Sequence, residues 1–170
     1  MNILLPGFRI RPLANTPADL AGVLAVYRQC EDFLSLGPVA QASPEMVQAD
    51  LALSREEGGS FHAIEDTQNG EMVGIVDYVL SGFEGDPELA FLGLLMIAAP
   101  RRGKGLGEAV TRAVEADIRR DGCARAIRSG VQVNNPGAIR FWLRMGYQIT
   151  SGPEDLPDGT TAYPLFKRLD

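Results

Sequence analysis

The sequence contains little cysteine, histidine and tryptophan: two, one and one in 170 residues. The two cysteines, Cys30 and Cys123, have neither a paired nor a metal-ligand spacing, which argues against a disulfide framework and a zinc-finger type of site. We therefore expect reduced thiols, a cytoplasmic protein and no bound metal. The histidine, His62, has no cluster of partner residues, so a histidine satisfied within a sheet is favoured over a catalytic one.

The sequence also lacks long apolar runs and an excess of basic residues. No apolar run approaches the roughly 18 residues that span a bilayer. Met1–Pro6 lacks the basic start and the small-residue cleavage site of a secretory signal, so we expect neither membrane insertion nor export. Lys and Arg total 16 against 22 Asp and Glu, and the net charge of −6 disfavours nucleic-acid binding. An acidic surface attracts amines, but the same charge also serves solubility.

Length predicts one globular domain over residues 1–170, and periodicity predicts the element order β-α-α-β-β-β-α-β-α-β-β. Thr16 as N-cap and Pro17 at the first helical position predict the start of the first helix, and its apolar stripe extends to Cys30. The other expected helices cover residues 44–57, 106–120 and 136–145, and the expected strands cover 8–11, 60–66, 72–80, 88–98, 126–133, 147–150 and 161–167. The loop 151–159, rich in Gly, Pro and Asp, is expected to shape a substrate side of the fold.

A glycine-rich loop lies between an apolar run, residues 92–99, and the helix expected from Leu106. Its sequence is Arg101-Arg102-Gly103-Lys104-Gly105-Leu106-Gly107. Glycines at this spacing let successive backbone N–H groups point into one concavity, and the helix that follows adds the positive end of its dipole. Cationic side chains stand beside it, although the chain as a whole is acidic. The loop therefore predicts a site for a polyphosphate-like anion.

Two common phosphate loops do not fit this segment. A Walker A loop needs Ser or Thr after Gly-Lys, but Gly105 follows Lys104 here. A dinucleotide fingerprint needs G-x-G-x-x-G, whereas Gly103, Gly105 and Gly107 are spaced G-x-G-x-G and no early βαβ unit leads into them. A nucleotide-binding protein is therefore disfavoured.

The segment from Arg102 to Gly107, Arg-x-x-Gly-x-Gly in a broader notation, resembles the acyl-CoA pyrophosphate loop of the general N-acetyltransferase (GNAT) superfamily. A second segment, residues 131–147, is similar to the second cofactor motif of that superfamily: a strand, Asn-x-x-Ala, a helix and Gly-aromatic. Asn135 as N-cap, Pro136 at the first helical position and Gly146 at the C-terminal end support that layout independently. The resemblance implies an α/β (α+β) GNAT fold, with a mixed, mostly antiparallel sheet flanked by helices and a splayed strand pair at the cofactor site.

The resemblance also implies acetyl-CoA as co-substrate and direct transfer of the acetyl group to a primary amine of a small molecule, peptide or protein. The pyrophosphate would bind at Arg102, Gly103, Lys104, Gly105, Leu106 and Gly107. Backbone groups of Leu95, Met96 and Ile97 would hold the pantetheine arm and stabilise the developing oxyanion. Asn135 would either cap its helix or contact the cofactor. Arg101 would either bind phosphate or be solvated. Dimers are common in this family, so a homodimer stays an open alternative.

The acid and base of the reaction are less clearly marked. Trp142 stands where many family members carry the tyrosine that serves as general acid, and an indole N–H cannot take that role at neutral pH. Tyr78 and Tyr147 are the phenols that could substitute. The candidate bases are Asp77, in the middle of a strand, and Glu88, at the start of the next one; Glu31 and Asp32, at the end of the first helix, are candidates for holding a cationic acceptor. The alternative is a catalytically impaired module that binds acyl-CoA with a sensing or regulatory role.

Overall fold

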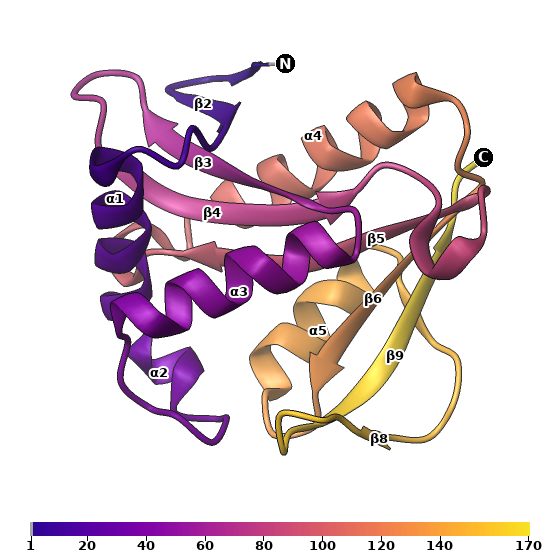
Figure 1. Cartoon of the computed structure of the whole chain (residues 1–170). Coiled ribbons are helices and arrows are strands. Elements are labelled where there is room, and N and C mark those ends of the chain that lie inside the picture. The colour runs from indigo at the N-terminus through magenta and orange to yellow at the C-terminus, as the bar shows by residue number, and fades with distance from the viewer. Residues whose placement is uncertain (1) are drawn as a thin grey trace.

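The computed structural model describes residues 2–170, which form one nine-stranded sheet with helices on both faces (Figure 1). The order along the sheet is β1-β2-β3-β4-β5-β6-β9-β7, and β8 pairs with β9. All paired strands run antiparallel except β5 and β6. The expected mixed, mostly antiparallel sheet is confirmed. The strands are β1 Ile3–Leu5, β2 Phe8–Pro12, β3 Ser60–Asp66, β4 Met72–Val79, β5 Leu89–Ile97, β6 Ala126–Gln132, β7 Gln148–Ile149, β8 Glu154–Asp155 and β9 Thr161–Arg168.

Each face of the sheet is covered by helices that bury one apolar stripe. Helices α1, Pro17–Arg28, and α3, Pro44–Glu56, pack their buried residues with Phe61, Ile75 and Met96. Helices α4, Leu106–Asp121, and α5, Pro136–Arg144, pack against the opposite face, in the larger cluster that holds the side chains of Val76 and Leu92. Short helical segments complete the chain: α2 Glu31–Leu34, η1 Phe83–Gly85 and η2 Ala99–Arg101. None of the helices in residues 2–170 is both long and apolar enough to cross a membrane.

The first helix is shorter than the sequence predicts. It ends at Arg28, so Cys30 lies beyond it, and Glu31 and Asp32 open α2 rather than close α1. No Gly or Pro marks the break. It is caused by tertiary contacts, because the Gln29 carbonyl accepts a hydrogen bond from the Ala99 N–H and the Cys30 thiol lies 3.4 Å from the Ile97 carbonyl oxygen. The short strands β1 and β8 were also not predicted; β8 lies inside the loop 151–159.

The sheet splits between β5 and β6. These strands pair only where Leu89, Ala90 and Phe91 face Ala126, Ile127 and Arg128. The Ser129 hydroxyl donates to the Leu92 carbonyl at 2.7 Å, and beyond this point the strands separate. A bulge lies beside the split, because Asp77 faces Leu94 and Tyr78 faces Leu92, which leaves Gly93 without a partner on β4. The resulting gap in the sheet is the splayed pair that the sequence predicts.

Candidate functional site

The N-terminus of α4 has no side-chain cap. Its N-cap is Gly105, whereas Thr16, Ser43 and Asn135 each accept a hydrogen bond from the first turn of α1, α3 and α5. Gly105 has a φ of 82°, and a Cβ added there or at Gly103 would meet no atom within 4 Å. The first turn of α4 therefore presents N–H groups and a positive dipole end to an open concavity. This arrangement fits a phosphate group.

A cleft of about 500 Å³ extends from this loop between β5 and helices α4 and α5. Its walls contain five of the six loop positions predicted to bind pyrophosphate, two positions of β5 and residues of α5: Leu95, Ile97, Arg102, Gly103, Gly105, Leu106, Gly107, Glu108, Ala138, Phe141, Trp142 and Arg144. Met96, Lys104 and Asn135 do not line it. Met96 is buried on the opposite face of the sheet, and the Asn135 side chain accepts from the Ala138 N–H at 3.2 Å as a helix cap. We call this space the cofactor cleft.

The cations of the loop differ in their contacts. Arg101 forms ion pairs with Asp66 at 2.9 Å and with Glu71 at 3.1 Å, so it points away from the cleft. Arg102 donates to the Ile97 carbonyl at 2.7 Å and is paired with Asp32 of α2. The guanidinium lowers the pKa of the Asp32 carboxyl. Lys104 is exposed and forms no ion pair with the part of the chain described, so its charge is available to an anion.

The backbone of β5 offers polar groups to the gap in the sheet. The Ala98 N–H donates to Val73, so alternation along the strand directs the N–H and C=O groups of Ile97 and Leu95 away from β4. The Ile97 carbonyl is occupied by Arg102. Since β6 pairs with β5 only as far as Phe91, the Leu95 groups face the gap without a strand partner. They can bind an amide of a ligand or a developing oxyanion.

Aromatic residues close the inner end of the cofactor cleft. Trp142 is 7% exposed, lines the cleft and packs edge-on against Phe141 and Tyr147, with ring centroids 5.0 Å apart in each pair. Neither Tyr78 nor Tyr147 lines this cleft. Burial raises the pKa of both phenols well above its ordinary value. The structure thus brings no phenol into the position of a general acid within residues 2–170.

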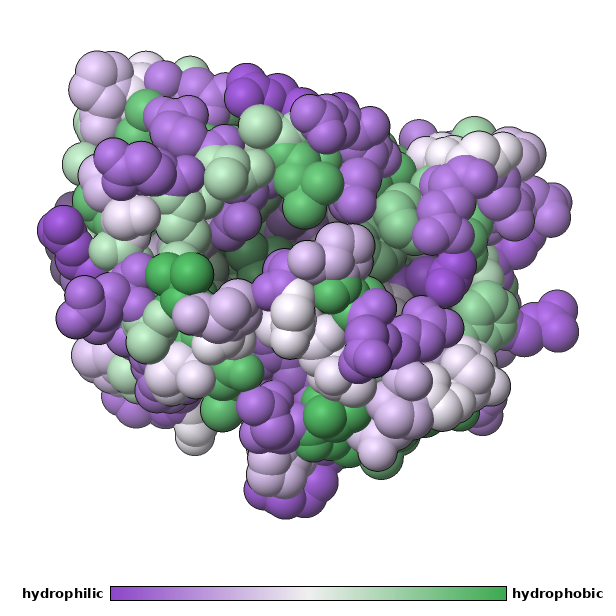
Figure 2. Space-filling view, turned by 60° about the horizontal axis from the view of Figure 1, so that its bottom comes forward, coloured by the Kyte–Doolittle hydropathy of each residue, from purple (hydrophilic) through white to green (hydrophobic). Residues whose placement is uncertain are grey.

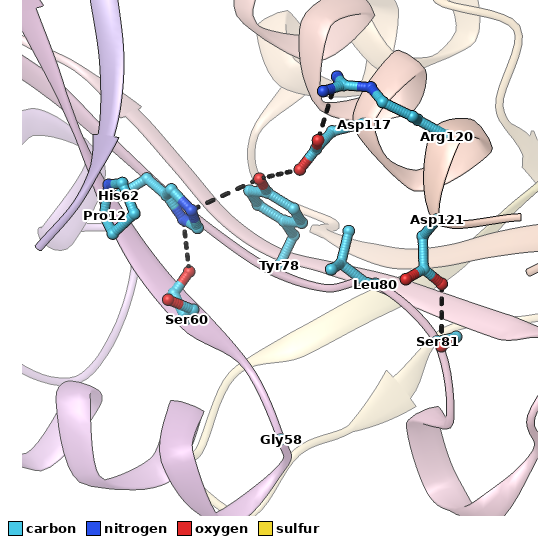
Figure 3. Close-up of a pocket in the computed structure, with 10 residues that line it drawn as sticks. All are labelled: Pro12, Gly58, Ser60, His62, Tyr78, Leu80, Ser81, Asp117, Arg120 and Asp121. Atoms are coloured by element: carbon cyan, nitrogen blue, oxygen red, sulfur yellow. Dashed lines mark hydrogen bonds and ion pairs between the residues drawn. The ribbon is translucent and has the colours of Figure 1, made fainter. Parts of the chain in front are cut away.

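Tyr78 belongs instead to a polar cluster that lines a different pocket on the α4 face of the sheet (Figure 3). Its hydroxyl donates to Asp117 at 2.7 Å, and its ring stacks on the His62 ring, with centroids 4.7 Å apart. His62 is buried, its Nδ1 lies 2.9 Å from the Ser60 carbonyl oxygen, and burial lowers its pKa. His62 is thus buried within the sheet, but Tyr78 and Asp117 lie beside it as a partner cluster that the sequence did not reveal. The cluster joins β3 and β4 to α4.

A second cleft, of about 490 Å³, opens on the other face of the split sheet. Figure 2 looks onto the end of the molecule at the bottom of Figure 1 and shows a hollow bordered by hydrophobic residues. The walls come from α2 and the loop after it, α3, β3, β4, β5, β6 and the late loop: Phe33, Leu34, Gly37, Pro38, Val39, Met46, Asp50, Leu53, Ser54, Glu57, Phe61, Asp77, Phe91, Gly93, Leu94, Gln132, Leu156, Asp158 and Thr160. We call this space the acceptor cleft.

Asp77 lies on the floor of the acceptor cleft and is 8% exposed. The Ser54 hydroxyl donates to its Oδ1 at 2.6 Å. Burial raises the pKa of the Asp77 carboxyl to about 6, with smaller contributions in the same direction from Glu57 and Asp50, while the Ser54 hydrogen bond acts against the shift. The carboxylate lies beside the bulge, where a Cβ on Gly93 would come within 3.0 Å of Oδ2. A carboxylate of this pKa at the gap can accept a proton near neutral pH.

The other acidic candidates are not brought to this position. Glu88 is exposed at the start of β5, donates from its N–H to Asp86 and lines neither cleft. Glu31 accepts a hydrogen bond from the Ala42 N–H, and Asp32 is paired with Arg102. The acids that do meet Asp77, namely Asp50, Glu57 and Asp158, were not predicted, because the segments that carry them are far apart in the sequence. In residues 2–170 no His, Cys, Asp and Glu side chains gather as a metal-ligand group.

A mixed sheet that splits beside an uncapped helix N-terminus is the architecture that the sequence motifs predict for acyl-CoA-binding proteins. A model of the acetyltransferase (GNAT) family matches residues 25–147. The chain belongs to this family.

Individual relatives agree with this assignment. Blasticidin-S acetyltransferase of Streptomyces morookaense is 36% identical over 77 residues, which are 45% of this chain and 54% of that protein. The match therefore spans about half the length of this curated relative. An acetyltransferase of Thermus thermophilus superposes with a TM-score of 0.76 at 23% identity, over 99% of this chain and 100% of that chain. AAC(6′)-Ib in complex with ribostamycin and coenzyme A has a TM-score of 0.74 at 21% identity, over 96% of this chain and 94% of its own. The structural likenesses show the fold.

Proposed function

We propose that the protein is an acetyl-CoA-dependent N-acetyltransferase that moves the acetyl group to a primary amine by direct attack. The observation that carries this proposal is the placement of Asp77 on the floor of the acceptor cleft, on β4 beside the bulge of β5 that lies next to the gap. Family membership and the uncapped glycine loop support coenzyme A as the ligand of the cofactor cleft. A relative named as a blasticidin-S acetyltransferase, and a structural neighbour bound to ribostamycin and coenzyme A, support an amine acceptor.

In this proposal the chain binds both substrates and moves one proton. Acetyl-CoA supplies an activated thioester. The first turn of α4, Gly103 and Gly105 hold its pyrophosphate, with Lys104 and Arg102 adding charge. The backbone of Leu95 orients the thioester carbonyl. Asp77 takes the proton that the amine loses as its nitrogen bonds to the acetyl carbon, and the carbon–sulfur bond breaks. The thiolate leaves without a phenol beside it, because its own stability permits this.

The direct test is release of free thiol from acetyl-CoA, measured with a chromogenic disulfide in the presence of a panel of polyamines, amino acids, aminoglycosides and N-terminal peptides. We expect thiol release that depends on an amine, with the acetylated amine seen by mass spectrometry. If acetyl-CoA raises the melting temperature but no amine is acetylated, the transferase proposal is wrong. That result would favour the module that binds acyl-CoA without turnover, for which Trp142 in the place of the usual tyrosine is the supporting observation.

The ion pair between Arg102 and Asp32 predicts a measurable competition. A pyrophosphate bound at the glycine loop competes with Asp32 for the Arg102 guanidinium, and the Asp32 carboxylate repels it. Since an exposed ion pair contributes only a few tenths to about 1 kcal/mol, we expect Asp32→Asn to lower the Kd for coenzyme A by up to about fivefold. Calorimetric titration measures this. Glu31→Gln is the matched control, because Glu31 contacts Ala42 rather than Arg102. Weaker binding by Asp32→Asn would show that Asp32 orients Arg102 toward the phosphates.

The remaining sequence-based expectations stay predictions. They are one domain over residues 1–170, a cytoplasmic location, a homodimer and no binding to nucleic acid or membrane.

A further inference from the structure

The acceptor cleft is acidic. Four carboxylates line it, Asp50, Glu57, Asp77 and Asp158, and no Lys or Arg is among its lining residues in the described part of the chain. They come from α3, from the residue that follows it, from β4 and from the loop after β8. Segments that are distant in sequence thus direct like charges into one space.

Three of these carboxylates are held by hydroxyl groups of the protein. Tyr27 donates to Asp50 at 2.6 Å, Ser54 to Asp77 at 2.6 Å and Thr160 to Asp158 at 2.6 Å. Each of these bonds uses one carboxylate oxygen and fixes the orientation of the group. The carboxylates also influence one another, because Asp158 raises the pKa of Asp50, after the larger effect of burial. Mutual repulsion of this kind is relieved by a bound cation.

The walls of the acceptor cleft also carry apolar side chains. Three large hydrophobic side chains on its walls are unusually exposed: Val39 at 55%, Leu53 at 53% and Leu156 at 41%. Phe33, Phe61 and Phe91 line it further. An exposed apolar group of this kind around a cleft is typical of a binding surface. In addition, Oε1 of Gln132 on the cleft wall is buried and has no hydrogen-bond partner among residues 2–170, so its bonding capacity is unused.

From these features, and on the basis of the proposed function, we infer that the acceptor is an amine with at least two positive charges separated by apolar carbon. The reacting amino group lies at Asp77. The second ammonium group lies between Asp50 and Asp158, and the carbon chain or ring between them packs on the exposed apolar side chains. Amines that carry a carboxylate are repelled by the same groups.

A homologous series of substrates tests the charge requirement. The rate of thiol release is measured with α,ω-diaminoalkanes of four to eight carbons, with n-alkylamines of equal length and with ω-amino carboxylic acids. We expect the best diamine to exceed the matched monoamine at least tenfold in kcat/KM, because a charge-assisted hydrogen bond in a cleft contributes about one factor of ten. The amino acids should react slowest. Equal kcat/KM values for diamines and monoamines would overturn the inference.

Variants assign the second charge to its site. Asp158→Asn and Asp50→Asn keep an oxygen for Thr160 and Tyr27 but remove the charge. Each should raise KM for the best diamine about tenfold with kcat little changed, and the loss in kcat/KM should be several times smaller for the monoamine. Glu154→Gln is the matched control, since Glu154 lies on the same late stretch of chain but outside the cleft. An equal loss for diamine and monoamine in the Asn variants would contradict the assignment.

Failure of the inference can be told from failure of the proposed function. If no amine is acetylated, the transferase proposal is wrong, and the charge requirement is then decided by calorimetric titration of 1,6-diaminohexane into protein saturated with coenzyme A. If the diamine binds and Asp158→Asn weakens its affinity, the inference is supported. If the diamine does not bind, the inference is wrong. If monoamines are acetylated as well as diamines, the function stands and the inference is wrong.

Discussion

We expect Gly105→Val to lower the affinity for coenzyme A by at least about a hundredfold. The loss is large because several charge-assisted hydrogen bonds of the loop are lost together. Gly105 has a φ of 82° with open space at its Cβ position, so a valine side chain would fill the concavity and would strain the backbone. The measurement is calorimetric titration with coenzyme A, together with the melting temperature of the unliganded variant.

Gly122→Val is the matched control for that strain. Gly122 caps the C-terminal end of the same helix with a φ of 81°, and it lines neither cleft. Both variants should lower the melting temperature by a similar amount, but only Gly105→Val should lose coenzyme A. Retained affinity in Gly105→Val would refute the placement of the phosphate at α4.

Asp77→Asn should lower kcat by a factor of about 10² to 10⁴, the usual contribution of a general base. Asp77 acts only when ionised, and burial raises its pKa to about 6. The kcat/KM of the unmodified protein should therefore rise as the pH rises through about 6, and this limb should disappear in the variant. The pH profile distinguishes this role from a structural one. A variant that keeps the limb near pH 6 would assign the proton transfer to another group.

Stability provides the control for Asp77→Asn. The folded state holds the Asp77 proton more tightly than the unfolded state, so the unmodified protein loses free energy of unfolding as the pH rises from about 4 to about 6, by up to about 3 kcal/mol. Asparagine does not titrate and can still accept from Ser54. Above pH 6 the variant should therefore be at least as stable as the unmodified protein, as thermal unfolding across pH can show.

The elements that follow local rules were predictable from the sequence. Thr16 and Asn135 cap their helices as expected, and the glycine loop begins α4. What the sequence could not reveal depends on tertiary contacts. The end of α1 is set by β5, and the partner of Arg102 is set by the position of α2.

The cofactor cleft was easier to predict than the acceptor cleft, because it depends more on local sequence and less on tertiary contacts. The cofactor cleft is lined mostly by one continuous loop and the strand before it, so two motifs are enough to indicate it. The acceptor cleft is assembled from seven separate segments, and nothing in the local sequence around Asp50 or Asp158 indicates that they meet. Asp77 could be proposed because a carboxylate in mid-strand is unusual. Glu88 was proposed from its position at the start of a strand, and it lines neither cleft.

The short pairing of β5 with β6 has a mechanical consequence. The hinge between the N-terminal and C-terminal parts of the sheet consists of three residue pairs, fastened at its inner end by the hydrogen bond from Ser129 to Leu92. A small rotation about so short a hinge produces its largest displacement at the far ends of the two strands, where Leu95 and Gln132 border the opening. Beyond this hinge the width of the opening is set not by strand pairing but by side-chain packing, in an apolar cluster that holds Leu92 of one part of the sheet and Val131 of the other.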